Sequence, residues 1–103
     1  MKTTYEAKGL VIGKCWGGSE CGYASRKLTA PTKKAVMKQA EEGVANGSLD
    51  SGMGFERLQG AILEVTKITT TKIKGKEFVN EETEINVIGE LTEKQFEHYV
   101  NYL

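Results

Sequence analysis

The fold is decided by the longest β-rich stretch of the chain, residues 61–88, which reads AILEVTKITTTKIKGKEFVNEETEINVI. Its first half is rich in Ile, Val and Thr, which favour extended strands because their branched side chains pack well on a pleated surface. Lys74-Gly75-Lys76 interrupts the stretch with a turn sequence, and the residues from Glu77 to Ile88 resume it. We therefore expect a long antiparallel hairpin with strands over residues 61–73 and 77–88.

The two arms of this hairpin differ in how their apolar residues alternate. In the second arm Val79, Ile85 and Val87 share one side and polar residues fill the other, which is typical of a half-buried strand. In the first arm Leu63 lies on one side and Ile62 on the other, so apolar groups fall on both sides. This pattern predicts a bulge or a change of parity partway along the first arm.

A second hairpin is expected at the N-terminus. Residues 4–16 favour a strand, residues 17–22 read GGSECG and favour a turn, and residues 23–28 favour the returning strand. One side of the first strand carries Leu10, Ile12 and Trp16. This side is expected either to lie under another element or to remain open as an apolar stripe.

Between the hairpins, residues 32–46 predict a helix, because Val36, Ala40 and Val44 recur every four residues among strong helix formers. Gly47 is a typical stop, since glycine readily adopts the left-handed conformation that ends a helix.

The next stretch, residues 48–55, reads SLDSGMGF and favours a loop. Its glycines suggest a cradle for an anion, but the further Gly, Lys and Ser or Thr of a phosphate-binding loop are missing. We interpret it as an ordinary connection in which Met53 and Phe55 plug into the core, followed by a short helical turn over residues 55–58.

The C-terminal helix has the most specific local signature in the chain. Thr92 and Gln95 have the spacing of a capping box, in which each side chain binds the backbone of the other. His98 is expected on the solvent side. The predicted buried side consists of Phe96, Tyr99, Val100 and Leu103.

These elements predict one compact α+β domain over residues 1–103, in ββαββα order. We expect a mostly antiparallel four-stranded sheet with two helices packed on one face. The other face is then either polar or the working surface of the protein, and pairing through an unprotected edge strand is a third alternative.

Composition narrows the classes of function. The chain has 103 residues, 14 Lys+Arg against 14 Asp+Glu, and 39% hydrophobic residues. Such a balance argues against both a uniformly basic nucleic-acid binder and a disordered tail. The polar N-terminus does not resemble a secretory signal and no apolar run approaches membrane-spanning length, so we expect a cytoplasmic protein.

The two cysteines, Cys15 and Cys21, flank the turn of the first hairpin. With His98 they supply three metal ligands, fewer than the four of a structural zinc site, so no metal is expected. We expect two free thiols in a reducing compartment, with a cross-strand disulfide or redox pair as the alternative. No nucleophile and base stand in a recognisable arrangement, so we expect no enzymatic activity and no cofactor.

The charges are unevenly distributed along the chain. Residues 1–38 contain eight basic and two acidic residues, a net charge of +6, so the remaining 65 residues carry −6. The acidic hairpin arm is expected to pair with lysines across the hairpin. Basic residues near aromatic ones are typical of surfaces that bind phosphates and stack on bases. The candidate binding residues of this kind are Tyr5, Trp16, Tyr23, Arg26, Lys27, Lys33 and Lys34.

Two hypotheses for function follow. The preferred one is a small non-catalytic binding module that acts through protein–protein contacts, with a second copy of the chain as one candidate partner. The alternative is single-stranded nucleic-acid binding through the basic, aromatic N-terminal part. No membrane partner is expected.

Overall fold

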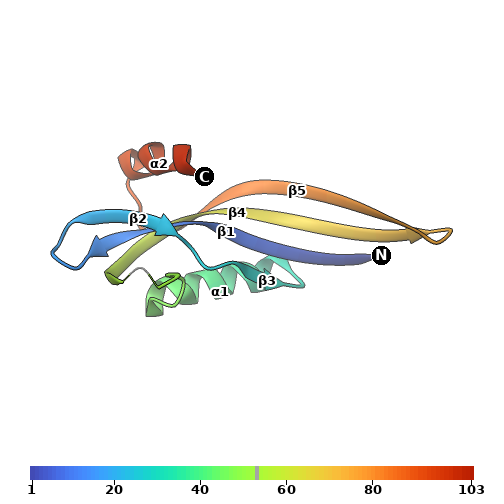
Figure 1. Ribbon diagram of the computed structural model, residues 1–103, viewed down its shortest axis with the longest axis horizontal. Helices are drawn as coiled ribbons and strands as arrows, with labels where there is room; N and C mark the ends of the chain where they lie inside the picture. Colours follow the sequence, from blue (N-terminus) through green and yellow to red (C-terminus); the bar gives the residue numbers. More distant parts are fainter. Residues whose placement is uncertain (53) are drawn as a thin grey trace.

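The computed structural model describes residues 1–52 and 54–103 and contains one antiparallel sheet with helices on both sides (Figure 1). The strands are hydrogen-bonded in the order β2-β1-β4-β5, and β3 pairs with the same edge of β1 as β2. The elements in chain order are β1 (Lys2–Cys15), β2 (Glu20–Ala24), β3 (Leu28–Ala30), α1 (Lys33–Asn46), β4 (Phe55–Ile73), β5 (Lys76–Gly89), α2 (Glu93–Tyr99) and a 3-10 turn, η1 (Val100–Tyr102).

The predicted α+β class is confirmed, but the predicted four strands and ββαββα order are wrong, because the second strand is split into β2 and β3. At Ser25 the chain bends to meet the loop that follows α1: Ser25 forms a bridge with Asp50, and the Arg26 amide donates to the Leu49 carbonyl at 2.9 Å. The Ser25 hydroxyl also accepts from the Gly9 amide at 3.0 Å. These contacts interrupt regular pairing with β1 and leave five strands.

The long hairpin is confirmed. β4 and β5 pair without interruption from Gly60 opposite Gly89 to Ile73 opposite Lys76. Lys74 and Gly75 form the turn with φ angles of 51° and 77°, as a tight hairpin turn with two left-handed residues requires.

Two details of β4 differ from the prediction. The strand begins at Phe55, so the predicted helical turn over residues 55–58 is wrong; this segment pairs with the end of β1 instead. The irregularity lies earlier than expected, because Ile12 pairs with Gly60 whereas Gly13 pairs with Leu58. Residues 61–70 of β4 pair regularly with β1, and their apolar groups fall on both sides because Leu63 is buried in the core under α1 and Ile62 is buried on the opposite side of the sheet.

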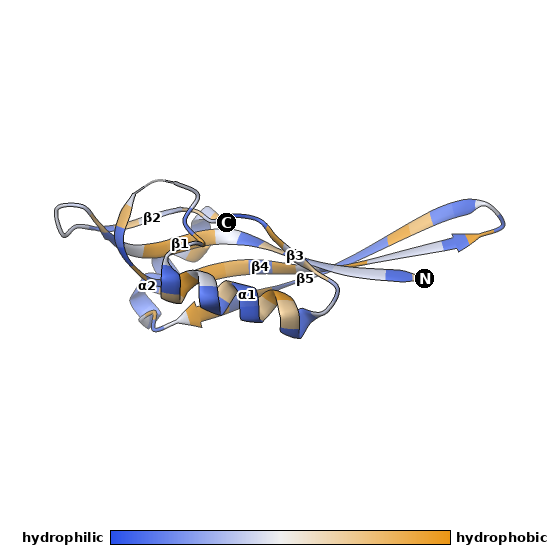
Figure 2. Ribbon diagram, turned by 90° about the horizontal axis from the view of Figure 1, so that it is seen from below, coloured by the Kyte–Doolittle hydropathy of each residue, from blue (hydrophilic) through white to orange (hydrophobic). Residues whose placement is uncertain are grey.

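Helix α1 lies along one face of the sheet (Figure 2). It is capped by Thr32, whose hydroxyl accepts from the Ala35 amide at 3.1 Å, and it ends at Gly47 with a φ of 79°, as predicted. The core lies between this helix and the sheet. Its buried members are Ala7, Val11, Ala30, Val36, Ala40, Leu49, Ala61, Leu63, Val65 and Ile88.

Helix α2 packs on the opposite face, so the prediction that both helices share one face is wrong (Figure 1). Ile12 is fully buried on the α2 side, and its neighbours in the register are Gly22 and Gly60. A Cβ at Gly22 would lie 2.6 Å from the Tyr99 ring, and one at Gly60 would lie 2.9 Å from Leu91. The missing side chains therefore let the C-terminal segment approach the sheet over Ile12.

The sheet is much longer than the helices that cover it. The molecule measures 58 × 25 × 20 Å, and the far end of the β4–β5 hairpin extends beyond α1 (Figure 2). Within the described residues, neither helix is both long enough and apolar enough to span a bilayer.

Candidate interaction surface

The predicted basic and aromatic residues fall at two ends of the molecule. Tyr5 lies near the start of β1 and Trp16 directly follows its end, about 35 Å away at the rise of an extended strand. Trp16 is 73% exposed in the β1–β2 turn. Tyr23 packs edge-on against Phe55, with ring centroids 5.6 Å apart. The structure therefore does not bring the three aromatic residues together into one stacking platform.

Arg26, Lys27 and Lys33 of this set contact other groups of the protein. Lys27 forms an ion pair with Glu6 at 3.0 Å, and Lys33 forms one with Glu84. The Arg26 Nε donates to the Asp50 carbonyl at 3.0 Å.

Lys34 is exposed on α1. Tyr5 and Lys33 do line one small pocket of about 230 Å³, but Lys67, Glu82 and Glu84 line it too. The two carboxylates offset the attraction of the two lysines for a phosphate.

The two cysteines form a disulfide between the end of β1 and the start of β2, with Cα atoms 6.1 Å apart. The prediction of two free thiols is therefore wrong. The turn between Cys15 and Cys21 is also closed by backbone hydrogen bonds, including one from the Cys15 amide to the Ser19 carbonyl at 2.8 Å. Disulfides persist in oxidising compartments and are rare in the cytosol, so this bond does not favour the predicted cytoplasmic location, which stays a prediction.

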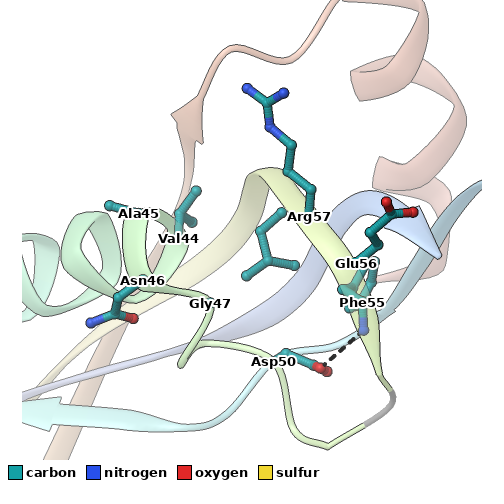
Figure 3. Close-up of a pocket in the computed structure, with 9 residues that line it drawn as sticks. Val44, Ala45, Asn46, Gly47, Asp50, Phe55, Glu56 and Arg57 are labelled. Atoms are coloured by element: carbon teal, nitrogen blue, oxygen red, sulfur yellow. Dashed lines mark hydrogen bonds between the residues drawn. The ribbon is translucent and has the colours of Figure 1, made fainter. Parts of the chain in front are cut away.

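A pocket of about 420 Å³ lies where the end of α1 faces the start of β4 (Figure 3). The Asp50 carboxylate accepts from the backbone amides of Gly54 at 3.1 Å and Phe55 at 3.5 Å. The Asp50 carboxylate thus binds the amides that a bound anion would otherwise use, which supports the interpretation of this loop as an ordinary connection. Phe55 is half-buried and packs against the core as predicted, whereas Met53 lies outside the described residues.

This pocket has few of the groups that catalysis needs. Figure 3 shows the Arg57 side chain directed away from Asp50, so the two charges do not converge. Across residues 1–52 and 54–103, no three His, Cys, Asp or Glu side chains are grouped as a metal would require.

A hydrogen-bonded cluster holds α2 to the sheet. Glu20 on β2 accepts from the Gln95 amide group at 2.5 Å and from the Tyr99 hydroxyl at 3.1 Å. Gln95 also exchanges two hydrogen bonds with Gln59 of β4, at 2.8 and 3.0 Å. Burial, together with the hydrogen bond to Glu20, raises the pKa of Tyr99. The capping box between Thr92 and Gln95 is present as predicted.

The apolar side of α2 is nevertheless only partly covered. No residue of α2 is fully buried, and Tyr102 and Leu103 just beyond it are 67% and 38% exposed. His98 is exposed, as predicted, and packs against the rings of Tyr99 and Tyr102 at 4.8 and 5.7 Å between centroids.

Beside α2, the same sheet face remains uncovered. The register places Leu10, Ile62 and Val87 in one row across three strands, and Lys8, Glu64 and Ile85 in the next row. Ile62 is buried, but Ile85 and Val87 on the outer strand are 49% and 45% exposed. We call this surface the open face; it comprises Lys8, Leu10, Glu64, Ile85 and Val87 with Tyr102 and Leu103 of the C-terminal turn.

The open face contains a shallow groove of about 360 Å³ between the C-terminal turn and the sheet. Leu10, Tyr102 and Leu103 supply its apolar lining, and Lys8 and Glu64 are its charged residues. Alternation in the sequence predicted both the apolar side of β1 that carries Leu10 and the shared side of Ile85 and Val87. It did not connect them, because the order β1-β4-β5 places them on one face only in the folded sheet.

No protein-family model, curated protein or solved structure matches this chain. The candidate surface therefore stands on its own geometry and chemistry.

Proposed function

We propose that the chain is a non-catalytic binding module that acts through protein–protein contacts at the open face. The observation that carries this proposal is the apolar surface formed by Ile85, Val87, Tyr102 and Leu103 on the face that α2 leaves uncovered. Exposed apolar groups that adjoin one another, rather than lying singly, are typical of surfaces that bind another protein.

The charges around this surface favour a protein over a nucleic acid as the partner. Lys8 and Glu64 lie directly opposite each other in the sheet, so the face carries both signs side by side. A polyphosphate backbone needs a surface of one sign, whereas a protein partner can match both. The proposal therefore does not extend to the nucleic-acid alternative.

The proposal is tested by affinity capture from a lysate of the source cells, with cross-linking to locate the contact. Val87→Lys places a charge in the open face. Phe78→Lys is the matched control, because Phe78 lies on the same strand, is 53% exposed and points to the other side of the sheet. We expect a protein that is cross-linked near β5 and captured by the wild type and Phe78→Lys but not by Val87→Lys. Capture that is equal for all three baits refutes the proposal, as does the absence of any captured protein, a second copy of the chain included.

A further inference from the structure

The open face has a raised half, where the C-terminal turn projects above the sheet, and a bare half, where the strands have no other element above them among the described residues. The C-terminal turn stands over β1 and β2, where Tyr102 and Leu103 line the groove with Leu10 and Ala24. Two strands further along the sheet, Ile85 and Val87 on β5 have no helix above them within the described residues. Each half of the face presents apolar groups at a different height.

Such a surface is complementary to itself. In a two-fold contact the same patch meets itself, so a raised half on one copy can sit over the bare half of the other. We propose that the open face binds a second copy of this chain, with Tyr102 and Leu103 of each copy packed on Ile85 and Val87 of the other. This inference rests on the proposed function and names its partner.

The exposed area is close to what a modest dimer needs. At about 200 Å² for a large side chain, the exposed fractions of Ile85, Val87, Tyr102 and Leu103 offer on the order of 400 Å² per copy. The smallest stable interfaces bury about 600 Å² per partner, and Lys8, Leu10 and Glu64 around the groove add to the apolar area. Because affinity depends on the quality of packing as well as on area, we expect a contact at this lower limit to give a reversible dimer.

Charge is compatible with self-association. The chain has no net charge, with 14 basic and 14 acidic residues, so two copies do not repel each other as wholes. At the contact itself, the adjacent Lys8 and Glu64 allow each sign to meet its opposite on the other copy. A strongly basic partner would be repelled by Lys8, and a strongly acidic partner would be repelled by Glu64.

Sedimentation equilibrium from 1 to 300 µM tests the inference. We expect a reversible dimer for the wild type and for Phe78→Lys, and a monomer for Val87→Lys. A wild type that stays monomeric at 300 µM overturns the inference. A dimer that Val87→Lys leaves intact also overturns it, because the contact then lies elsewhere.

Cysteine pairing tests the arrangement of the two copies. Under mild oxidation, with the native disulfide left in place, an equimolar mixture of Tyr102→Cys and Val87→Cys should form a bridge between chains in far higher yield than either variant alone. If the double variant bridges these positions within one chain, the C-terminal turn covers its own β5 and the two-copy arrangement is wrong.

The two proposals fail in different ways. A monomeric wild type that still captures another protein through Val87 refutes the second copy but leaves the binding module standing. A monomer that captures nothing refutes both.

Discussion

Removal of the Cys15–Cys21 disulfide should lower stability by an amount that the structure defines. The bond closes a loop of seven residues, counting both cysteines, since the sequence separation is 6. In the chain-entropy model, a closed loop of this length removes about 2 kcal/mol of conformational freedom from the unfolded state. For a domain of about 100 residues this corresponds to a fall in melting temperature of about 10 °C.

The native turn should survive the change. Hydrogen bonds from the Cys15 amide to Ser19 and from the Gly18 amide to Cys15 hold it without the sulfurs. The loss therefore arises in the unfolded state, and the emission wavelength of the nearby Trp16 in the folded protein should stay the same, although its intensity changes because a disulfide quenches indole fluorescence. A Cys15→Ser, Cys21→Ser double variant replaces both sulfurs without leaving a lone thiol.

Thermal unfolding followed by circular dichroism measures the effect, with and without reductant. The reduced wild type and the double variant should melt together, about 10 °C below the oxidised wild type at the loop entropy given above. Reductant should not change the double variant. A difference of about 2 °C is on the order of the measurement error and far below the expected shift. If the oxidised and reduced wild type melt within that difference, the disulfide does not constrain the unfolded chain and the reasoning is wrong.

Three further predictions concern single contacts. The contact with Lys33 lowers the pKa of Glu84 below its usual value of 4.5. The ion pair therefore adds stability above that pH, and this contribution is lost as pH falls through the lowered pKa. Glu84→Gln should flatten the acid limb of a curve of stability against pH. The pKa of Tyr99 is raised above 10.0, so its contribution is complete below pH 10 and is lost as pH rises through the raised value; the protection factors of the α2 amides, which correct for the base-catalysed rise in intrinsic exchange, should fall there, but not in Tyr99→Phe. Ile12→Ala opens a cavity under α2 and should cost about 2–5 kcal/mol in urea unfolding; a loss below 1 kcal/mol, under the range for buried Ile→Ala, would contradict the burial.

The sequence predicted the elements that depend on local chemistry. The turn at Lys74 and Gly75 and the stop at Gly47 follow from residues that tolerate a positive φ, and both are present. The capping box at Thr92 follows from the spacing of two side chains within one turn. Features of this kind need no knowledge of distant parts of the chain.

What the sequence missed depends on contacts between distant segments. Glycine within a helix ordinarily lowers its stability, but at Gly43 of α1 a Cβ would lie 2.9 Å from the Leu49 Cβ, so glycine makes room for packing. The split at Ser25 depends on Asp50, 25 positions along the chain. The side of the sheet taken by α2 depends on space above Gly22 and Gly60. None of these partners can be identified from periodicity alone.

The candidate site likewise combines features that the sequence predicts with features that depend on contacts between distant segments. Tyr5 and Lys33 were both predicted as binding residues and do share a pocket, but the folded sheet also places Lys67, Glu82 and Glu84 in it, so its positive and negative charges balance. The acidic arm was expected to pair with lysines across the hairpin. The register confirms that Glu82 lies opposite Lys67 and that Glu77 lies opposite Lys72.

Among the described residues, two regions of the sheet have no element above them, and their side chains decide which one gains more from a partner. At the end of the outer hairpin Ile73 and Phe78 are diagonal neighbours on one side and Val79 lies on the other, each directly opposite a threonine or a lysine. Polar rows that water can solvate separate these apolar groups from the core, among them the hydrogen-bonded pair of threonines 66 and 83 at 2.9 Å.

On the open face, the exposed Ile85 and Val87 instead lie next to each other on one side of β5, and Val87 continues the row of Leu10 and buried Ile62. A partner placed there extends an existing apolar core and removes contiguous surface from water, at about 25 cal/mol for each Å² buried. The same partner on the outer hairpin would have to desolvate the polar rows as well. Association at the face beside the core is therefore favoured over association along the hairpin, although the hairpin residues are the more exposed.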